Sequence, residues 1–305
     1  MLTTTHRGRF GRHDDLALRA KPGESLTLEQ MRASLPAIFA DHAHESRSTR
    51  YVHISTEDML TELVAKDFLP VEARVSRSRV EGKQDFTKHM IRFRAKPDIA
   101  TAFYETKRQV GDVSFEVLLR NAHDGTSSYQ FMAGLLKLLC LNGLVVSDGE
   151  IENVKVLHTG NRQRQLNQVV EGAFTVLDQG PRVIDTVRRW RGVDLTGDDR
   201  MAFAEAARIV RFGDAEGKVE TPIQAGQLLE ARRYEERGKT DLWSTFNVIQ
   251  ENAIRGGLTA MGRDANNRPR RSTSREVKAI DGDVKINKAL WLLAERLAEH
   301  KGAAA

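Results

Sequence analysis

Between Phe68 and Asn121, apolar and polar residues alternate in three successive runs, the pattern of β-strands that bury one face. In the second run, Ile91 and Phe93 occupy odd positions, whereas Lys88, Arg92 and Arg94 occupy even positions. A turn around Gly82 separates the first two runs. The spacing therefore predicts an antiparallel meander with strands over 69–79, 86–95 and 113–121.

The polar face of this predicted meander is basic. Residues 68–96 contain eight Lys or Arg and three acids, an excess that suits a polyanion. Lys and Arg on strands also discourage edge-to-edge aggregation, so a solvated sheet face remains the alternative interpretation. The candidate nucleic-acid contacts on this face are Arg74, Arg77, Arg79, Lys88, Arg92 and Arg94.

Around the meander the sequence predicts an α+β core over residues 51–160. Ser55 has the position of a helix cap, with Asp58 three residues later, and opens a helix to about Lys66. A second, strongly apolar helix is expected over 129–141, ended by Asn142 and Gly143 and followed by a strand at 144–146. The predicted order of elements in the core is therefore helix, three strands, helix and strand. We interpret residues 1–50 as a polar N-terminal arm with a short helix over 28–40 that is interrupted by Pro36.

Residues 161–305 show a helical pattern, interrupted by two segments over 213–221 and 256–280. Helices are predicted over 163–177, 182–190, 198–212, 222–233, 242–255 and 281–300. The segment from Arg255 to Lys278 carries seven cations and two acids. Together with its Gly, Pro, Ser and Asn content, this predicts a mobile loop over 256–280 that orders on a phosphate backbone, or alternatively a solvated linker. Its candidate nucleic-acid contacts are Arg268, Arg270, Arg271 and Arg275.

Overall composition limits the classes of function. The 305 residues have a net charge of +5, which favours nucleic acid as a partner, and contain one cysteine, Cys140. The single cysteine, the absence of a long apolar run and the absence of a signal-like segment predict a cytoplasmic protein with no membrane contact.

No phosphate-binding loop, dinucleotide fingerprint, zinc motif or nucleophile elbow occurs, so neither enzymatic activity nor a cofactor or metal is expected. His123 and Asp124 fit a turn better than an acid–base pair. The polar residues of 243–252, including Asn247 and Glu251, fit hydrogen bonds between packed helices.

Several short segments carry a resemblance to a known family. They are Arg50–Ile54, Asn121–Tyr129, Cys140–Leu144, Trp243–Asn252 and Ile286–Trp291. Together they resemble the phage- and plasmid-borne family called domain of unknown function 932, which includes YafZ- and YubP-like proteins. The resemblance covers about 51–297 and implies work on DNA during transfer or recombination, but no catalytic residues.

The predicted element order also resembles the core of single-strand annealing recombinases of the Rad fifty-two and lambda Red-beta type. This resemblance implies a homo-oligomeric ring or filament whose basic groove holds one strand. The leading hypothesis is therefore a single-stranded DNA-binding, ATP-independent strand-annealing protein of a phage or plasmid. The alternative is a protein-binding anti-restriction or anti-defence regulator that meets a host or plasmid protein. A hydrolase using His123, Asp124 and Glu251 is the third hypothesis, disfavoured because carboxylate clusters for two metals are missing.

Overall fold

The computed structural model describes residues 16–21, 24–45, 53–76, 78, 80–96, 113–137, 142–146, 154–157, 161–263 and 266–303. The chain divides into two compact units. Unit 1 comprises Met1–Val145, Glu150–Pro181 and Lys278–Ile280, and unit 2 comprises Val146–Gly149, Arg182–Val277 and Asp281–Ala305. The predicted helical region 161–305 is shared between them, because its first helix, α4 (Arg162–Asp178), belongs to unit 1.

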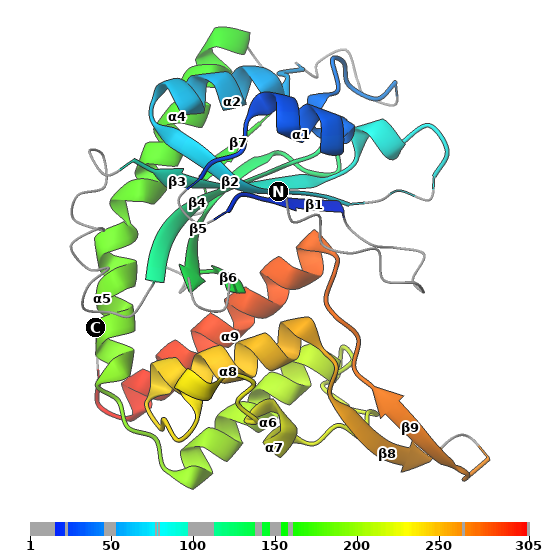
Figure 1. The fold of residues 1–305 in the computed structure, drawn as a ribbon, viewed down its shortest axis with the longest axis vertical. Coiled ribbons are helices and arrows are strands. Elements are labelled where there is room, and N and C mark those ends of the chain that lie inside the picture. The colour runs from blue at the N-terminus through cyan, green and yellow to red at the C-terminus, as the bar shows by residue number, and fades with distance from the viewer. Residues whose placement is uncertain are drawn as a thin grey trace. The chain divides into compact units, whose positions relative to one another are not determined.

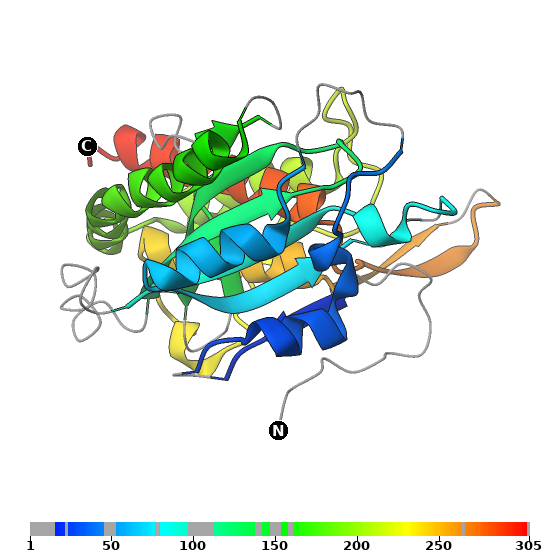
Figure 2. The same cartoon turned by 90° about the horizontal axis from the view of Figure 1, so that it is seen from above.

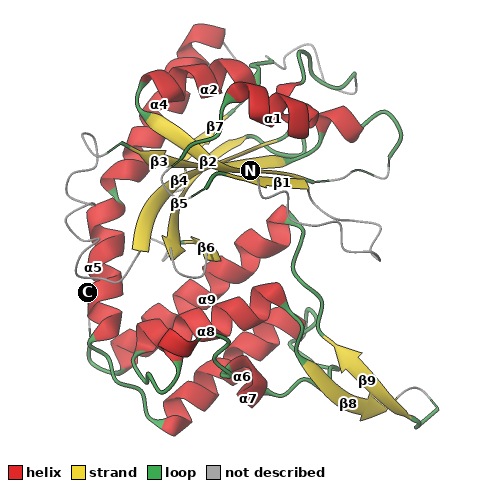
Figure 3. Cartoon of the chain, in the orientation of Figure 1, coloured by secondary structure: helices red, strands yellow, loops and turns green. Residues whose placement is uncertain are grey.

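Unit 1 is built on an antiparallel sheet in which the strands follow one another in chain order from β1 to β6, and β7 pairs with β5 (Figures 1 and 3). The predicted meander forms its centre, and the third predicted strand has the observed bounds. The strands are β1 (Leu16–Arg19), β2 (Phe68–Val75), β3 (His89–Ala95), β4 (Val113–Asn121), β5 (Tyr129–Lys137), β6 (Asn142–Val145) and β7 (Val154–Val156).

Two helices, α2 (Thr56–Ala65) and α4 (Arg162–Asp178), lie across one face of this sheet (Figure 2). The Ser55 hydroxyl accepts a hydrogen bond from the Asp58 amide, which confirms the predicted cap. Under α4, the rings of Phe68 and Phe174 meet edge to face with centroids 5.2 Å apart. Ile91 and Phe93 are fully buried as predicted, but Met90 and Arg92 on the other face of β3 are buried as well.

The predicted helix over 129–141 is wrong, because residues 129–137 form strand β5. A continuous apolar run is compatible with a buried helix or with a strand covered on both sides. β5 pairs with β4 on one edge and with β6 and β7 on the other, so it lies inside the sheet and its side chains are buried over 131–135. Cys140 lies outside the described residues.

The described part of residues 1–50, which is 16–21 and 24–45, is packed into unit 1. β1 pairs with β2, and the amide of Leu26 donates to the Pro70 carbonyl. Helix α1 (Leu28–Ser34) and a 3-10 turn, η1 (Pro36–Phe39), form the predicted short helix with its break at Pro36. Met31 and Ile38 are fully buried. A second 3-10 turn, η2 (Gln84–Phe86), precedes β3.

Unit 2 consists mainly of helices, and most of the predicted ones are confirmed to within a few residues. They are α5 (Gly180–Arg191, in unit 2 from Arg182), α6 (Gly197–Phe212), α7 (Ala225–Leu228), the 3-10 turn η4 (Tyr234–Glu236), α8 (Leu242–Arg255) and α9 (Ile280–His300, in unit 2 from Asp281). The helix predicted over 222–233 shrinks to the four residues of α7. None of the helices in the described part of the chain is long and apolar enough to cross a membrane.

Helix α8 is the buried centre of unit 2, which explains its mixed polar and aromatic sequence. Trp243 and Phe246 pack with Trp190 of α5 and Trp291 of α9 in one aromatic cluster. Gln250 donates to Asn287 over 2.9 Å, and Asn252 donates to the carbonyls of Leu228 and Glu230. The predicted hydrogen bond between packed helices is confirmed at Gln250. Asn247 instead donates to the Trp243 carbonyl of its own helix, and Glu251 pairs with Arg233 and Arg255.

Residues 256–280 do not form a loop. They contain an antiparallel hairpin, β8 (Thr259–Arg263) and β9 (Pro269–Thr273), which extends away from the helices of unit 2 in both views (Figures 1 and 2). The Arg, Ser and Gly content that indicated mobility also permits a two-stranded ribbon, whose stability comes from the ladder of backbone hydrogen bonds and from its anchored base.

Candidate nucleic-acid interface

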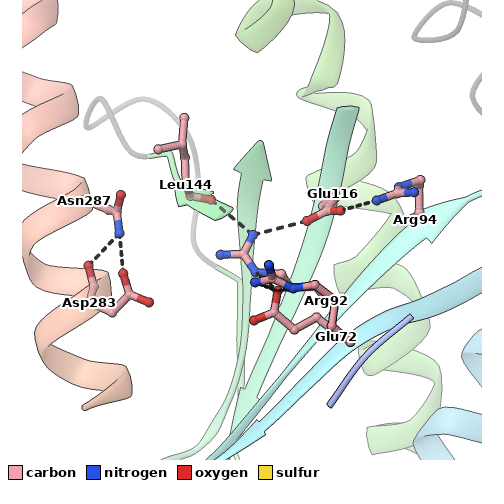
Figure 4. A network of polar contacts seen from close by, with 8 residues as sticks. Glu72, Arg92, Arg94, Glu116, Leu144, Asp283 and Asn287 are labelled. Atoms are coloured by element: carbon pink, nitrogen blue, oxygen red, sulfur yellow. Dashed lines mark hydrogen bonds and ion pairs between the residues drawn. The ribbon is translucent and has the colours of Figure 1, made fainter. Parts of the chain in front are cut away.

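The cations of the main sheet are largely engaged with carboxylates. Arg92 is only 2% exposed and forms ion pairs with Glu116 at 3.2 Å and Glu72 at 3.7 Å (Figure 4). Its Nη1 also donates to the Leu144 carbonyl over 3.4 Å. Arg94 reaches the other oxygen of Glu116 at 2.9 Å. The prediction of a cationic face open to solvent is therefore wrong at Arg92, which is a buried structural residue.

Neighbouring strands provide the two carboxylates of this ion-pair network. Glu72 lies opposite Arg92 on β2, and Glu116 lies on β4, two residues from the position opposite Arg92. Burial opposes ionisation of Glu72, but the charges of Arg19, Arg92 and Arg74 outweigh it and hold its pKa below the ordinary value. The cations of the sheet thus already compensate buried negative charge.

Gly134 on β5 gives the Arg92 guanidinium its space. A Cβ at this position would lie 3.2 Å from Arg92 Nη1 and 2.1 Å from Leu118 Cδ1, so any larger residue forces a shift. The contact of Gly134 with Arg92 and Leu118 follows from the strand register and cannot be predicted from the sequence alone.

The other predicted sheet contacts differ in exposure. Arg74 is partly buried and donates to the Lys278 carbonyl over 3.0 Å, and Lys88 is partly exposed. Arg77 and Arg79 lie outside the described residues. The structure therefore assembles Arg92 and Arg94 in one network and gives no common exposed surface to the described members of the predicted set.

The exposed members of the predicted set of cations lie on the hairpin or next to it. Arg268, Arg270, Arg271 and Arg275 are all exposed, and neither strand contains a carboxylate. In the part of the chain that the structure describes, no hydrogen bond or ion pair engages the side chain of Arg270 or Arg271. Two adjacent cations on a strand without carboxylates give a local positive potential that attracts anions.

The base of the hairpin is held in place. Gly256 has φ +63° and ψ −149°, a conformation essentially restricted to glycine. Its missing side chain lets the backbone of Ser274 and Arg275 approach, since a Cβ would lie 2.5 Å from the Arg275 carbonyl carbon. Arg211 donates to the carbonyls of Ala253 and Arg275, each over 2.7 Å. The base of the ribbon is therefore anchored to α6 and to the end of α8 by these contacts.

A buried histidine pair in unit 1 was missed by sequence reasoning. Thr56 Oγ1 lies 3.0 Å from Nε2 of both His89 and His123. The Thr87 carbonyl can only accept, so His89 Nδ1 carries hydrogen and its Nε2 accepts from the Thr56 hydroxyl, which in turn accepts from His123. Burial lowers the pKa of His89 to about 4, so the ring is neutral near pH 7.

The structure gives no support to a hydrolase site built from His123, Asp124 and Glu251. Asp124 Oδ1 accepts from the amide and hydroxyl of Thr126, which is a turn-stabilising arrangement. Glu251 belongs to unit 2 and pairs with Arg233 at 3.0 Å and Arg255 at 3.2 Å. Among the described residues, no group of three or more His, Cys, Asp or Glu could hold a metal ion.

Comparison with known proteins identifies the relatives of this chain. Two Escherichia coli K12 proteins are similar over 289 residues, or 95% of this chain and 96% of each relative: UPF0380 protein YafZ is 40% identical and UPF0380 protein YfjQ is 39% identical. No solved structure matches. Residues 43–291 match the family described as "Domain of unknown function (DUF932)". The chain therefore belongs to the DUF932 family.

Proposed function

We propose that this protein binds single-stranded DNA, with the β8–β9 hairpin contacting the phosphate backbone. The observation that carries the proposal is the pair Arg270–Arg271, both exposed on a hairpin whose two strands contain no carboxylate. Arginines bind phosphate strongly because their planar guanidinium donates two parallel hydrogen bonds. Arg268 and Arg275 extend the cationic surface toward the ends of β9.

Strand annealing without ATP is the activity we propose for this binding. Holding a strand by its phosphates leaves the bases available for pairing, and such a step requires no nucleotide hydrolysis, cofactor or metal. The hairpin takes over the role first assigned to the sheet face, because Arg92 is committed to Glu72 and Glu116. The protein acts in this proposal as a binding protein and not as an enzyme.

A salt titration of oligonucleotide binding tests the proposal. The double variant Arg270→Ala/Arg271→Ala should bind a labelled single strand more weakly, and the slope of log K against log salt should become shallower by about 1.4, or about 0.7 for each lost phosphate contact. Fluorescence anisotropy with single-stranded DNA, duplex DNA and RNA of equal length measures both quantities.

The matched control is Arg188→Ala/Arg296→Ala, which removes the same charge from exposed positions on α5 and α9. This control should leave the slope nearly unchanged. Equal slopes for the two double variants would show that binding follows net charge and not the hairpin. A wild-type protein that binds none of the three nucleic acids at low salt would refute the proposed function.

The second candidate is a protein-binding anti-restriction or anti-defence regulator. Tyr234 favours it, because this side chain is 82% exposed on η4 and tyrosine is enriched in protein interfaces. The same binding assay separates the candidates, since a regulator of this kind shows no preference for single strands and no dependence on Arg270 and Arg271.

A further inference from the structure

The two faces of the β8–β9 hairpin differ in chemistry. Met261 lies opposite Arg271, and Arg263 lies opposite Pro269, so these four side chains share one face. Gly262 and Arg270 belong to the other face. A Cβ on Gly262 would lie 3.0 Å from Pro222 Cγ, so this second face meets the segment before α7 at Gly262, whereas Arg270 stays exposed. The face with Met261 is therefore the outward face.

Met261 is 65% exposed, although it lies in the middle of an ordered strand. A single exposed apolar residue needs no special explanation, but the neighbours of Met261 are informative. Arg271 stands directly across from it, Arg263 follows two residues along β8, and Pro269 lies on the diagonal. The outward face thus alternates apolar and cationic side chains at about 5–7 Å, the spacing of neighbouring positions on a ribbon.

A ligand that matches this face must alternate flat apolar groups with anions. Single-stranded nucleic acid has this chemistry, because each nucleotide carries a phosphate and an unstacked base whose face is accessible. A duplex hides the base faces, and an apolar side chain reaches them only after base steps are unstacked. The thioether of methionine makes favourable contacts with aromatic rings.

We propose that the outward face of the hairpin is a base-contacting subsite for single-stranded nucleic acid. Met261 packs against one unstacked base, while Arg263 and Arg271 bind the phosphates on either side. This inference rests on the proposed function and adds that the hairpin selects single strands through the base and not through the phosphates alone.

The test compares Met261→Ala with Met201→Ala, since Met201 is an exposed methionine elsewhere in unit 2. The probes are a thymine oligonucleotide, an abasic strand of the same length and a duplex. Met261→Ala should weaken binding of the thymine strand by about two- to tenfold, the range of a sulfur–aromatic contact, with an unchanged salt slope. It should not alter binding of the abasic strand, and Met201→Ala should alter neither. The thermal midpoint should stay the same because Met261 is exposed.

Several outcomes overturn the inference. If Met261→Ala binds the thymine strand like the wild type while Arg270→Ala/Arg271→Ala still flattens the salt slope, the base contact is refuted and the proposed function stands. If Met261→Ala weakens binding of the abasic strand as much as that of the thymine strand, Met261 supports the shape of the hairpin and contacts no base. If it weakens binding of the duplex equally, the hairpin contacts a groove of double-stranded DNA. A defect confined to anionic phospholipid vesicles, measured by co-sedimentation, makes the face a membrane contact. Failure of the wild type to bind any oligonucleotide refutes the proposed function itself.

Discussion

At the scale of single residues, Arg92 shows what alternation along a strand can and cannot predict. The pattern places Arg92 and Arg94 on the opposite strand face from Ile91 and Phe93, but Arg92 is buried as they are. It gives no information on the partner strands, which place Glu72 and Glu116 beside the arginines. A charged strand face looks the same in sequence whether its charges meet solvent or each other, because this distinction depends on strand register and burial.

The buried ion pairs lead to the first stability prediction. Arg92→Ala should lower the free energy of unfolding of unit 1 by about 3 kcal/mol or more, because it leaves Glu72 and Glu116 buried with less compensating charge. The surface control Lys21→Ala, which removes an exposed pair with Glu24, should leave it nearly unchanged. Urea unfolding measures both values. A change below about 1 kcal/mol for Arg92→Ala would contradict a structural role for the network.

His89 gives a prediction for pH. Its pKa falls from 6.5 in the unfolded chain to about 4 in the fold, mainly through burial, so the unfolded state binds more protons between these values. The contribution of His89 to the free energy of unfolding should be fully present above pH 6.5 and should fall by about 3 kcal/mol as the pH drops to 4. Burial also lowers the pKa of His53, which adds to the effect in the same direction.

Urea unfolding at several pH values between 4 and 7.5 measures the slope of the free energy of unfolding against pH. Carboxylates with lowered pKa, such as Asp58 and Asp199, change this free energy mainly below pH 4. His89→Gln should remove a large part of the slope, whereas His300→Gln, a change at an exposed helix end, should retain it. Identical slopes for His89→Gln and the wild type would show that the buried histidine is not the titrating group.

At the scale of elements, prediction succeeded where one face of the element meets solvent or a local signal marks its end. The cap at Ser55, the break at Pro36 and the amphipathic helices of unit 2 are examples. It failed at β5 because an apolar run buried on both faces has no period to read. It also failed for β8 and β9, which pair with each other inside an Arg-rich segment that composition alone describes as mobile.

The fixed base of the hairpin yields a prediction with an internal control. Gly256→Ala and Gly238→Ala both place alanine at positive φ, which costs about 1–2 kcal/mol. Only Gly256 has neighbours in the way, since nothing lies within 4 Å of a Cβ at Gly238. Gly256→Ala should therefore displace the hairpin, raise hydrogen exchange of the β8 and β9 amides and weaken single-strand binding. Unchanged exchange at these amides in Gly256→Ala would contradict the anchored base.

At the scale of the whole molecule, the family match extends over residues 43–291 and so includes parts of both units. The sequence predicted the α+β class and the helical C-terminal half, because these depend on element type and order. The sequence could not show that α4 belongs to unit 1, since this helix packs on the sheet through contacts between residues distant in sequence, such as Phe174 with Phe68.

Assembly on DNA is the prediction that belongs to this scale. One hairpin offers only a few phosphate contacts, too few to hold a long strand, and side-by-side protomers would multiply these contacts through their high effective concentration. Sedimentation velocity at micromolar protein should therefore show complexes that grow with the length of an added single strand, and Arg270→Ala/Arg271→Ala should reduce this growth, whereas Arg188→Ala/Arg296→Ala should not. A protein that remains monomeric with and without single-stranded DNA cannot form the continuous groove that annealing needs, and this result would favour the regulator hypothesis.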